Sequence, residues 1–342
     1  MDVDVLIVGQ GIAGTVLGET LIEKGQKVCF IDQGHQKASS IIAAGMYNPM
    51  GFKRVNKTWM IDDLLPFSKK FYNRLSEKLA YNFIRTYDIL KFFANESYRD
   101  MWNESAEHIA YILRSETKYP NDLINNTCGY GKVVDCGRLE LRRMLVQYRE
   151  WLIANNNLKE EIFDKNLLDI EACEYGSIRF KFLIFCQGHE GCENTYFKHL
   201  PLQKTKGELI RIKSADLESA NLLNKGFFIV PVGNDEYDVG STYNWGDETV
   251  QPTAEGKNQI LSKLRKLYRG TFEVVEHRAG LRPTVADRRP LIGLHPVHQK
   301  LGIFNGLGSK GVLLAPFFAN QFAEHLLQKR SLNPEVDINR FN

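Results

Sequence analysis

"VDVLIVGQGIAGTVLGETLIEKGQKVCFID", residues 3–32, joins an apolar run, a glycine-rich turn and a second apolar run in one short unit. The first run is β-branched or aliphatic, as in a strand buried on both faces, and the residues after the glycines have helical spacing. Gly9, Gly11 and Gly14 fit the pattern G-x-G-x-x-G. In this pattern the glycines make room for a phosphate and for close helix packing, and the helix N-terminus offers free N–H groups to a pyrophosphate. The stretch therefore predicts a dinucleotide-binding βαβ unit.

A carboxylate stands where the second strand of this unit ends. Residues 27–31 form that strand and Asp32 follows it directly. A carboxylate at this place can accept hydrogen bonds from an adenosine ribose, and it disfavours the 2′-phosphate of NADP. NAD and FAD are left as candidates. The alternative is an ordinary βαβ turn in which the glycines occur by chance.

Length and composition are those of an ordinary soluble globular protein. The 342 residues exceed what one core usually serves, so we expect two domains. The net charge of +3 is too small to imply a nucleic-acid partner, although residues 204–213 and 263–269 are locally basic. No apolar stretch reaches the ~20 residues of a membrane span, and the first strand begins at residue 3, which leaves no room for a signal peptide. We therefore expect a cytoplasmic protein without a membrane partner, with its six cysteines reduced and no metal site.

The rest of the chain mixes helical and strand patterns. Residues 59–79 predict a helix that is broken near Pro66. Residues 207–240 consist of strand-like runs separated by glycine, asparagine and aspartate turns, which predicts an antiparallel sheet. Further helices are expected at residues 137–157, 254–267 and 312–327, and further strands at residues 159–164, 178–188 and 271–280.

These patterns predict an α/β protein with two domains. We expect a Rossmann-like dinucleotide-binding domain and a second, α+β substrate domain built on the antiparallel sheet. The dinucleotide-binding domain is predicted to be discontinuous, and the substrate domain to consist of two insertions. The predicted division gives residues 1–45, 126–200 and 278–342 to the first domain and residues 46–125 and 201–277 to the second.

Several later segments resemble one family, and the resemblance runs from residue 3 to about residue 328. The most specific segments are "RAGLRPTVADRRPLIG" at residues 278–293 and "NGLGSKGVLLAPFFANQFAEHLL" at residues 305–327. Together with the N-terminal glycine turn, they make the chain resemble the FAD-dependent D-amino-acid oxidase and glycine oxidase superfamily. Less specific likenesses are "SSIIAAGMYNPM" (39–50), "FLIFCQG" (182–188), "LPLQKTKGELIRI" (200–212) and "FFIVPVGNDEYDVGSTY" (227–243).

The segment "GLGSKG", residues 306–311, is a second glycine-rich turn ahead of a helix. A helix N-terminus there would stabilise the negative charge that a reduced flavin carries around N1 and O2, whereas a nicotinamide has no such need. This argument and the resemblance both favour FAD over NAD. The alternatives are a tight turn before a surface helix and, for "AAGM" at residues 43–46, a packing loop of small residues.

The resemblance implies that a small amine or amino acid is oxidised by hydride transfer from the carbon beside its nitrogen to flavin N5. It implies FAD held without a covalent bond, with molecular oxygen as one candidate electron acceptor. Arg282 matches an arginine that binds a substrate carboxylate, the alternative being a structural ion pair with Asp287 or another acid. Tyr243, the second candidate catalytic residue, would close the substrate side of the pocket or pack on Trp245. The predicted FAD-binding residues are Gly9, Gly11, Ile12, Ala13, Gly14, Asp32, Gln33, Ser39, Ser40, Ala43, Ala44, Gly45, Met46, Ile162, Gly188, Arg282, Gly306, Gly308, Ser309, Lys310, Gly311 and Val312.

The chain departs from the family in the turn before Gly311, where Ser309 and Lys310 stand and glycine oxidases can carry a second arginine. Two rival functions stay open. The C-terminal motif also resembles the oxidase half of a bifunctional enzyme that modifies wobble uridine in transfer RNA. The 342 residues hold no methyltransferase domain, however, and the net charge is small for an RNA-binding protein. The other rival is a flavin-binding module without turnover. The sequence does not indicate an oligomeric state.

Overall fold

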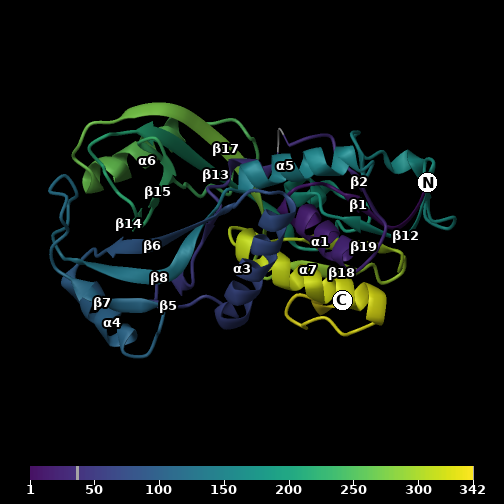
Figure 1. Ribbon diagram of the computed structural model, residues 1–342, viewed down its shortest axis with the longest axis horizontal. Coiled ribbons are helices and arrows are strands. Elements are labelled where there is room, and N and C mark those ends of the chain that lie inside the picture. The colour runs from purple at the N-terminus through teal and green to yellow at the C-terminus, as the bar shows by residue number, and fades with distance from the viewer. Residues whose placement is uncertain (36–37, 342) are drawn as a thin grey trace.

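The computed structural model describes residues 1–35 and 38–341. It contains two large β-sheets with helices packed around them, and both ends of the chain lie in the half built on the first sheet (Figure 1). This arrangement confirms the predicted α/β fold with a second domain built on a sheet.

The first sheet has eight strands, in the order β10-β11-β12-β1-β2-β9, with β19 and then β18 added beside β12. β1, β2, β9, β12 and β19 run parallel to one another, whereas β11 and β18 pair antiparallel with β12 and β19; the carboxyl ends of the five parallel strands therefore meet at one edge of the sheet. The bounds are β1 (Asp2–Val8), β2 (Val28–Ile31), β9 (Leu158–Lys159), β10 (Leu168–Asp169), β11 (Glu174–Tyr175), β12 (Ile178–Phe185), β18 (Leu291–Leu294) and β19 (Leu301–Asn305).

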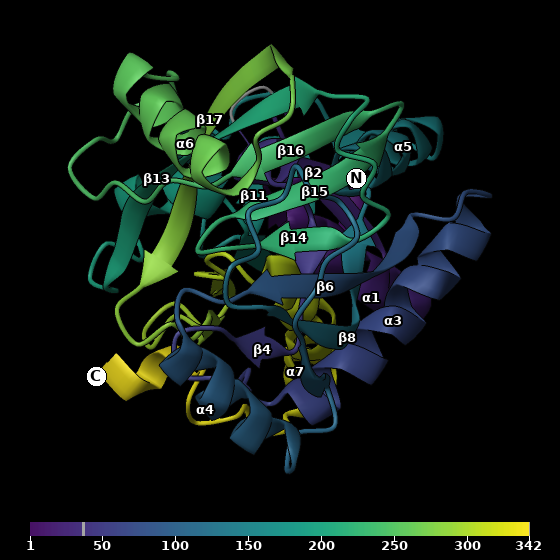
Figure 2. The same cartoon turned by 90° about the vertical axis from the view of Figure 1, so that its left-hand side faces the viewer.

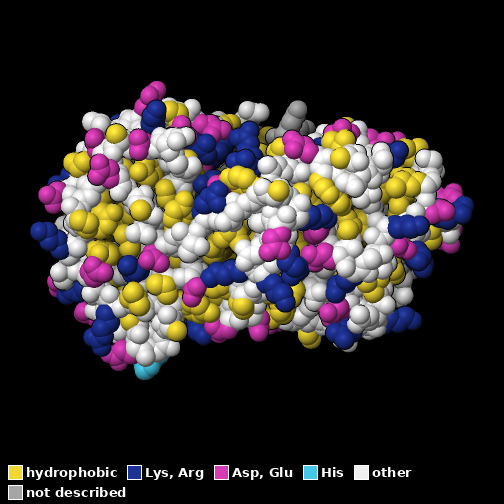
Figure 3. Space-filling view, in the orientation of Figure 1, with side chains coloured by type: hydrophobic (Ala, Val, Ile, Leu, Met, Phe, Trp, Pro, Cys, Tyr) yellow, Lys and Arg dark blue, Asp and Glu magenta, His cyan; other side chains and the backbone are white. Residues whose placement is uncertain are grey.

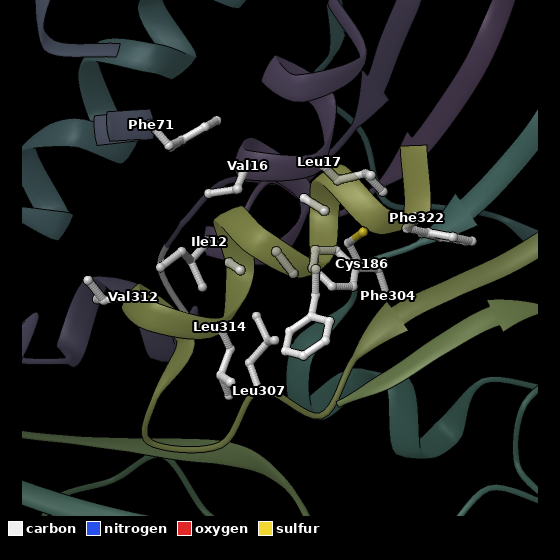
Figure 4. Close-up of a cluster of buried hydrophobic side chains, with 14 of the residues drawn as sticks. Ile12, Val16, Leu17, Phe71, Cys186, Phe304, Leu307, Val312, Leu314 and Phe322 are labelled. Atoms are coloured by element: carbon white, nitrogen blue, oxygen red, sulfur yellow. The ribbon is translucent and has the colours of Figure 1, made fainter. Parts of the chain in front are cut away.

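The helices of this half are α1 (Ile12–Glu23), α3 (Ile61–Lys78), α5 (Leu141–Ala154) and α7 (Gly311–Gln328). α1 packs against α7, and α7 packs in turn against α3 (Figure 4). Gly18 lets α1 lie close on β2, because a Cβ atom there would lie 2.2 Å from Phe30 Cζ, and a Cβ on Gly311 at the start of α7 would lie 3.3 Å from Ile12 Cγ2 of α1. The two glycine-rich turns at the starts of α1 and α7 are thereby held side by side.

The second sheet has nine strands, in the order β17-β13-β16-β15-β14-β6-β8-β3, with β7 beside β8 (Figure 2). All neighbours are antiparallel except β14 and β6. Helix α6 (Ala254–Leu267) covers one face of the sheet over a separate core. The other elements are α2 (Ser39–Ile42), β3 (Met46–Tyr47), the hairpin β4 (Met50–Gly51) and β5 (Asn56–Lys57), β6 (Ile84–Phe92), α4 (Glu96–Ala106), β7 (Ile112–Glu116), β8 (Tyr130–Leu139), β13 (Leu202–Lys213), β14 (Leu222–Asn224), β15 (Phe228–Gly233), β16 (Glu236–Gly240) and β17 (Glu273–Val285), with short 3₁₀ turns at Lys165–Leu167, Gly188–Glu193 and Ile338–Phe341.

The predicted domain boundaries cut across these sheets. β8 falls in segment 126–200 but pairs with β6 in the second sheet, and β17 belongs to that sheet as far as Val285. α3 falls in segment 46–125 but packs against α7 of the first half. The division into two domains stays a prediction, with boundaries that the strand pairing would move.

Three predicted elements differ from the structure. The helix near Pro66 is not broken but runs on as α3, because the residues around the proline bury one face that packs against α7. The strand expected at residues 159–164 is limited to β9, Leu158–Lys159. The helix expected from residue 137 begins at Leu141, because the residues before it still pair in β8.

The six cysteines are free, as expected for a reduced protein. Within the described residues, no helix is both long enough and apolar enough to span a bilayer.

Candidate functional site

A cavity of about 510 Å³ extends from the carboxyl ends of β1 and β2 to residues of β13, β15, β16 and β17 in the second sheet. Its position at the carboxyl edge of a parallel sheet is where α/β folds bind ligands. Most of the predicted residues line it: Gly9, Gly11, Ile12, Ala13, Asp32, Gln33, Ser39, Ser40, Ala43, Ala44, Gly45, Met46, Ile162, Gly188, Tyr243, Arg282, Gly308, Ser309, Lys310, Gly311 and Val312.

Two predicted glycines do not line the cavity, and both have a packing reason. A Cβ atom on Gly14 would lie 1.9 Å from the carbonyl oxygen of Gly9, so Gly14 lets α1 approach the strand. Gly306 has a φ of +72°, and a Cβ there would lie 2.9 Å from Val285 Cγ2. These two glycines shape the turns rather than the cavity wall.

Gly11, the N-cap of α1, is different because the protein itself does not require a glycine there. Its φ of −74° suits any residue, and the nearest atom to a built Cβ would be Ser40 Oγ at 3.5 Å. The side chain of Ser40 accepts a hydrogen bond from Ile12 N at 3.2 Å and so closes the turn. A glycine that the fold does not need, at a helix N-terminus lining a cavity, fits close approach by a phosphate.

Asp32 is held by three hydrogen bonds at the end of β2. Its Oδ2 accepts from Gln10 N at 2.8 Å, and its Oδ1 accepts from Gly34 N at 2.8 Å and from Arg149 Nη1 at 2.7 Å. A carboxylate has about four acceptor positions, so one position on Oδ2 is left for a ligand hydroxyl. Arg149, on α5, was missed by the sequence reasoning because 117 residues separate it from Asp32.

The start of α7 lies beside the start of α1 in the wall of the cavity. A Cβ on Gly311 would lie 3.3 Å from Ile12 Cγ2, and no described side chain caps the first turn of α7. Its free backbone N–H groups and the partial positive charge of the helix end therefore face the cavity. The arrangement suits a ligand that carries negative charge at two neighbouring places along the cavity wall, one at the start of each helix.

Arg282 lies at the far end of the cavity, on β17, without an acidic partner among the described residues. Its Nη2 donates to Ser241 Oγ at 2.5 Å, and its Nη1 lies 3.4 and 3.5 Å from the carbonyl oxygens of Thr242 and Lys206. Burial lowers the pKa of Arg282. The alternative of an ion pair with Asp287 is wrong, because Asp287 Oδ2 accepts from Arg340 Nε at 3.0 Å instead.

Space for this guanidinium is made by Gly207 of β13, where a Cβ would lie 2.1 Å from Arg282 Nη2. The ring of Tyr243 covers the guanidinium at 4.3 Å from its centroid, and the Tyr243 hydroxyl lies 3.0 Å from Ser309 Oγ. Tyr243 thus reaches from the second sheet to the turn before α7, which favours closure of the pocket over simple packing on Trp245. Sequence reasoning missed Gly207 and Ser241, since only strand pairing brings them to Arg282.

Lys310 adds a second cation near the start of α7. Its Nζ donates to Thr58 Oγ1 at 2.8 Å. Enclosure by the protein and the nearby charges of Arg288 and Arg289 lower the pKa of Lys310 to about 8. Arg282 and Lys310 therefore give the cavity two cationic side chains, whose donors suit an anion such as a carboxylate.

Comparison with known proteins agrees with this geometry. The sequence model of the "FAD dependent oxidoreductase" family matches residues 4–325. A glycine oxidase of Bacillus licheniformis is 26% identical over 95% of this chain and 93% of its own length. The tRNA 5-methylaminomethyl-2-thiouridine biosynthesis bifunctional protein of Marinobacter nauticus is 24% identical over 95% of this chain, which spans only 56% of that protein. The crystal structure of a glycine oxidase from Geobacillus kaustophilus has a TM-score of 0.82 at 19% identity, covering 100% of this chain and 98% of the other.

Proposed function

Because the chain belongs to the family of FAD-dependent oxidoreductases, we propose that it oxidises the carbon–nitrogen bond of a small amine that carries a carboxylate. The observation that carries this proposal is Arg282, a partly buried guanidinium at the end of the cavity with no acidic partner among the described residues. Such a cation is poorly solvated until an anion binds it.

The cavity fits FAD at its other end. Gly11 leaves room for the pyrophosphate, Asp32 keeps an acceptor position for the ribose, and the free N-terminus of α7 suits the charged edge of the flavin ring. FAD, when bound, supplies the two-electron oxidation. We propose that it is held without a covalent bond, so that denaturation should release all the flavin into solution.

The residues of this chain bind and orient the substrate. Arg282 would hold the carboxylate through two parallel N–H···O bonds, and Tyr243 and Ser241 would fix the plane of the guanidinium. Held in this way, the carbon beside the nitrogen would be positioned for the two-electron oxidation that FAD supplies when bound, which would leave an imine. Water then hydrolyses the imine to an oxo acid and ammonia or an amine.

The products test this reaction. Glycine should give glyoxylate and ammonia, and N-methylglycine should give glyoxylate and methylamine, in equal amounts. Oxygen uptake, compared with reduction of an artificial dye, identifies the electron acceptor. A purified protein that contains FAD but forms no oxo acid from any carboxylated amine would contradict the proposal and favour a flavin-binding module.

A second candidate is oxidation of an aminomethyl group on transfer RNA, as the name of the Marinobacter nauticus relative suggests. The observation that favours it is the exposed pair Tyr243 and Trp245, at 59% and 60% exposure, beside the substrate end of the cavity. Aromatic rings at such a place can stack on nucleobases. Mass spectrometry of transfer RNA nucleosides after incubation with the protein distinguishes this candidate from the first.

A further inference from the structure

A second hollow, of about 490 Å³, lies outside the flavin cavity, between α5 and one face of the second sheet. Five arginines line it, and we name it the arginine groove: Arg142 and Arg143 on α5, Arg138 on β8, Arg211 on β13 and Arg278 on β17. Lys and Arg side chains gather on the surface where α5 meets β13 and β17 (Figure 3). Its wall includes Ala43 and Ala44, which also line the flavin cavity, but the proposed oxidation uses none of the five arginines.

The groove is separate from the substrate end of the cavity, although both use one face of β17. Arg278 and Arg282 are four residues apart on this strand, which places them about 13 Å apart at the usual rise of a strand. Gly280 lies between them, and Ile42 of α2 packs over it, with its side chain 3.3 Å from the position of a Cβ. A carboxylate on Arg282 therefore does not reach the arginine groove.

The inner part of the groove has its charges paired. Asp238 accepts from Arg211 Nε at 2.9 Å and from Arg278 Nη2 at 2.7 Å. Glu140, a second acid of the wall, is paired with Arg85 at 3.0 Å. Glu150, the third acid of the wall, is exposed on α5.

The outer part has three arginines without an acidic partner among the described residues. Arg138 donates to the carbonyl oxygen of Pro231 at 3.3 Å, and burial lowers its pKa. Arg143 lies 3.6 Å from the ring centroid of Tyr81, a contact that leaves its charge uncompensated. Arg142 is exposed on the rim. The groove therefore carries more positive than negative charge, and ion pairs already hold the side chains of its inner wall.

Two buried polar atoms in the wall have no hydrogen-bond partner within residues 1–35 and 38–341: Arg278 Nε and Gln147 Oε1. The side chain of Arg278 is only 9% exposed, so water does not compensate for the missing bond. Amide groups can present either their N–H₂ or their oxygen in this position, so Gln147 can donate to an anion as well. Unpartnered donors beside unpaired guanidinium groups indicate an anionic ligand.

We propose that the arginine groove binds phosphate groups. Guanidinium groups match phosphate oxygens bidentately, and arginines from four different elements surround a space too large for one carboxylate. The phosphate can belong to a small phosphorylated compound or to an RNA backbone, since both present the same oxygens. The groove is a second site, independent of the amine that the flavin cavity accepts.

The test uses the FAD-loaded protein with two probes, inorganic pyrophosphate followed by calorimetry and a labelled single-stranded RNA followed by fluorescence anisotropy. The variant is Arg142→Gln with Arg143→Gln, both exposed on α5. The matched control is Arg265→Gln with Lys266→Gln, an exposed basic pair in the last turn of α6. Flavin absorbance and Tm of both variants should equal those of the natural protein.

We expect the groove variant to lose affinity by about tenfold or more while the control keeps it. For RNA, the slope of log affinity against log salt should also fall by about one for each arginine removed. RNA binding that depends on the groove assigns an RNA backbone. Pyrophosphate binding that depends on the groove, with no such RNA binding, assigns a small phosphorylated ligand. The proposal is overturned if neither probe binds, or if both variants bind as the natural protein does.

Discussion

Replacing Arg282 by methionine removes the guanidinium that we assign to the substrate carboxylate and keeps most of the side-chain volume. In the structure this guanidinium has hydrogen bonds to Ser241 and to backbone carbonyls but no acid, and burial lowers its pKa. A bound carboxylate would complete a charged, bidentate pair. Truncating one partner of such a pair costs about 2 to 5 kcal/mol, which corresponds to about 30- to 5,000-fold in affinity.

The effect should be selective for substrates with a carboxylate. We expect Arg282→Met to raise the KM for N-methylglycine by that factor and to change little for an amine of the same size without a carboxylate. Arg282→Lys should fall between, because an ammonium group cannot form both bonds of the fork. Steady-state kinetics with the two substrates, at saturating FAD, measures the effect.

Stability provides the control. Since Arg282 has no acidic partner in the structure, its loss should leave the Tm unchanged or raise it. Arg340→Gln is the matched variant: it breaks the pair with Asp287 and should lower the Tm without changing substrate preference. If Arg282→Met melts earlier and loses activity equally with both substrates, Arg282 holds the fold, and the reasoning is refuted.

Three further predictions follow from single residues. Gly11→Val should abolish FAD binding without lowering the apoprotein Tm, because only the ligand needs that space; full flavin occupancy of the purified variant would contradict this. Gly311→Asp should lower the midpoint potential of the flavin in spectroelectrochemistry, because a carboxylate at the N-terminus of α7 opposes reduction; an equal or higher potential would remove the argument. Lys91 is buried with only Asn224 as hydrogen-bond partner, and burial lowers its pKa from 10.5 to about 8. Its charge therefore costs stability below pH 8, and this cost of about 3 kcal/mol should disappear as the pH rises from 8 to 10.5. Urea unfolding of the natural protein against Lys91→Met checks it, and a difference that does not change with pH would speak against it.

The sequence predicted the parts of the site that lie close together along the chain. Gly9, Gly11 and Asp32 belong to one βαβ unit, whose spacing follows from the geometry of a strand, a turn and a helix. The turn before Gly311 was predicted for the same reason, since a glycine-rich run ahead of an apolar helix is a local signal. The end of the cavity that we propose for FAD is therefore the part whose lining residues could be named from the sequence.

The residues around Arg282 could not be predicted in this way, because segments that are distant in the sequence form this end of the cavity. Ser241, which follows β16, meets Arg282 of β17 only because both strands belong to one sheet. The same limit applies to β8, which the sequence analysis did not predict as a strand and which joins the second sheet by pairing with the distant β6. Arg282 itself was found through a resemblance, and its lack of an acidic partner became visible only in the structure.

The most direct test of the central claim is an anaerobic titration of the purified holoprotein with N-methylglycine, followed by flavin absorbance. Our account predicts that the flavin bands bleach with N-methylglycine and with glycine, that they persist with methylamine, and that the bleaching is lost in Arg282→Met. The account is contradicted if carboxylated amines leave the bands unchanged while dithionite bleaches them fully, or if methylamine bleaches them equally well.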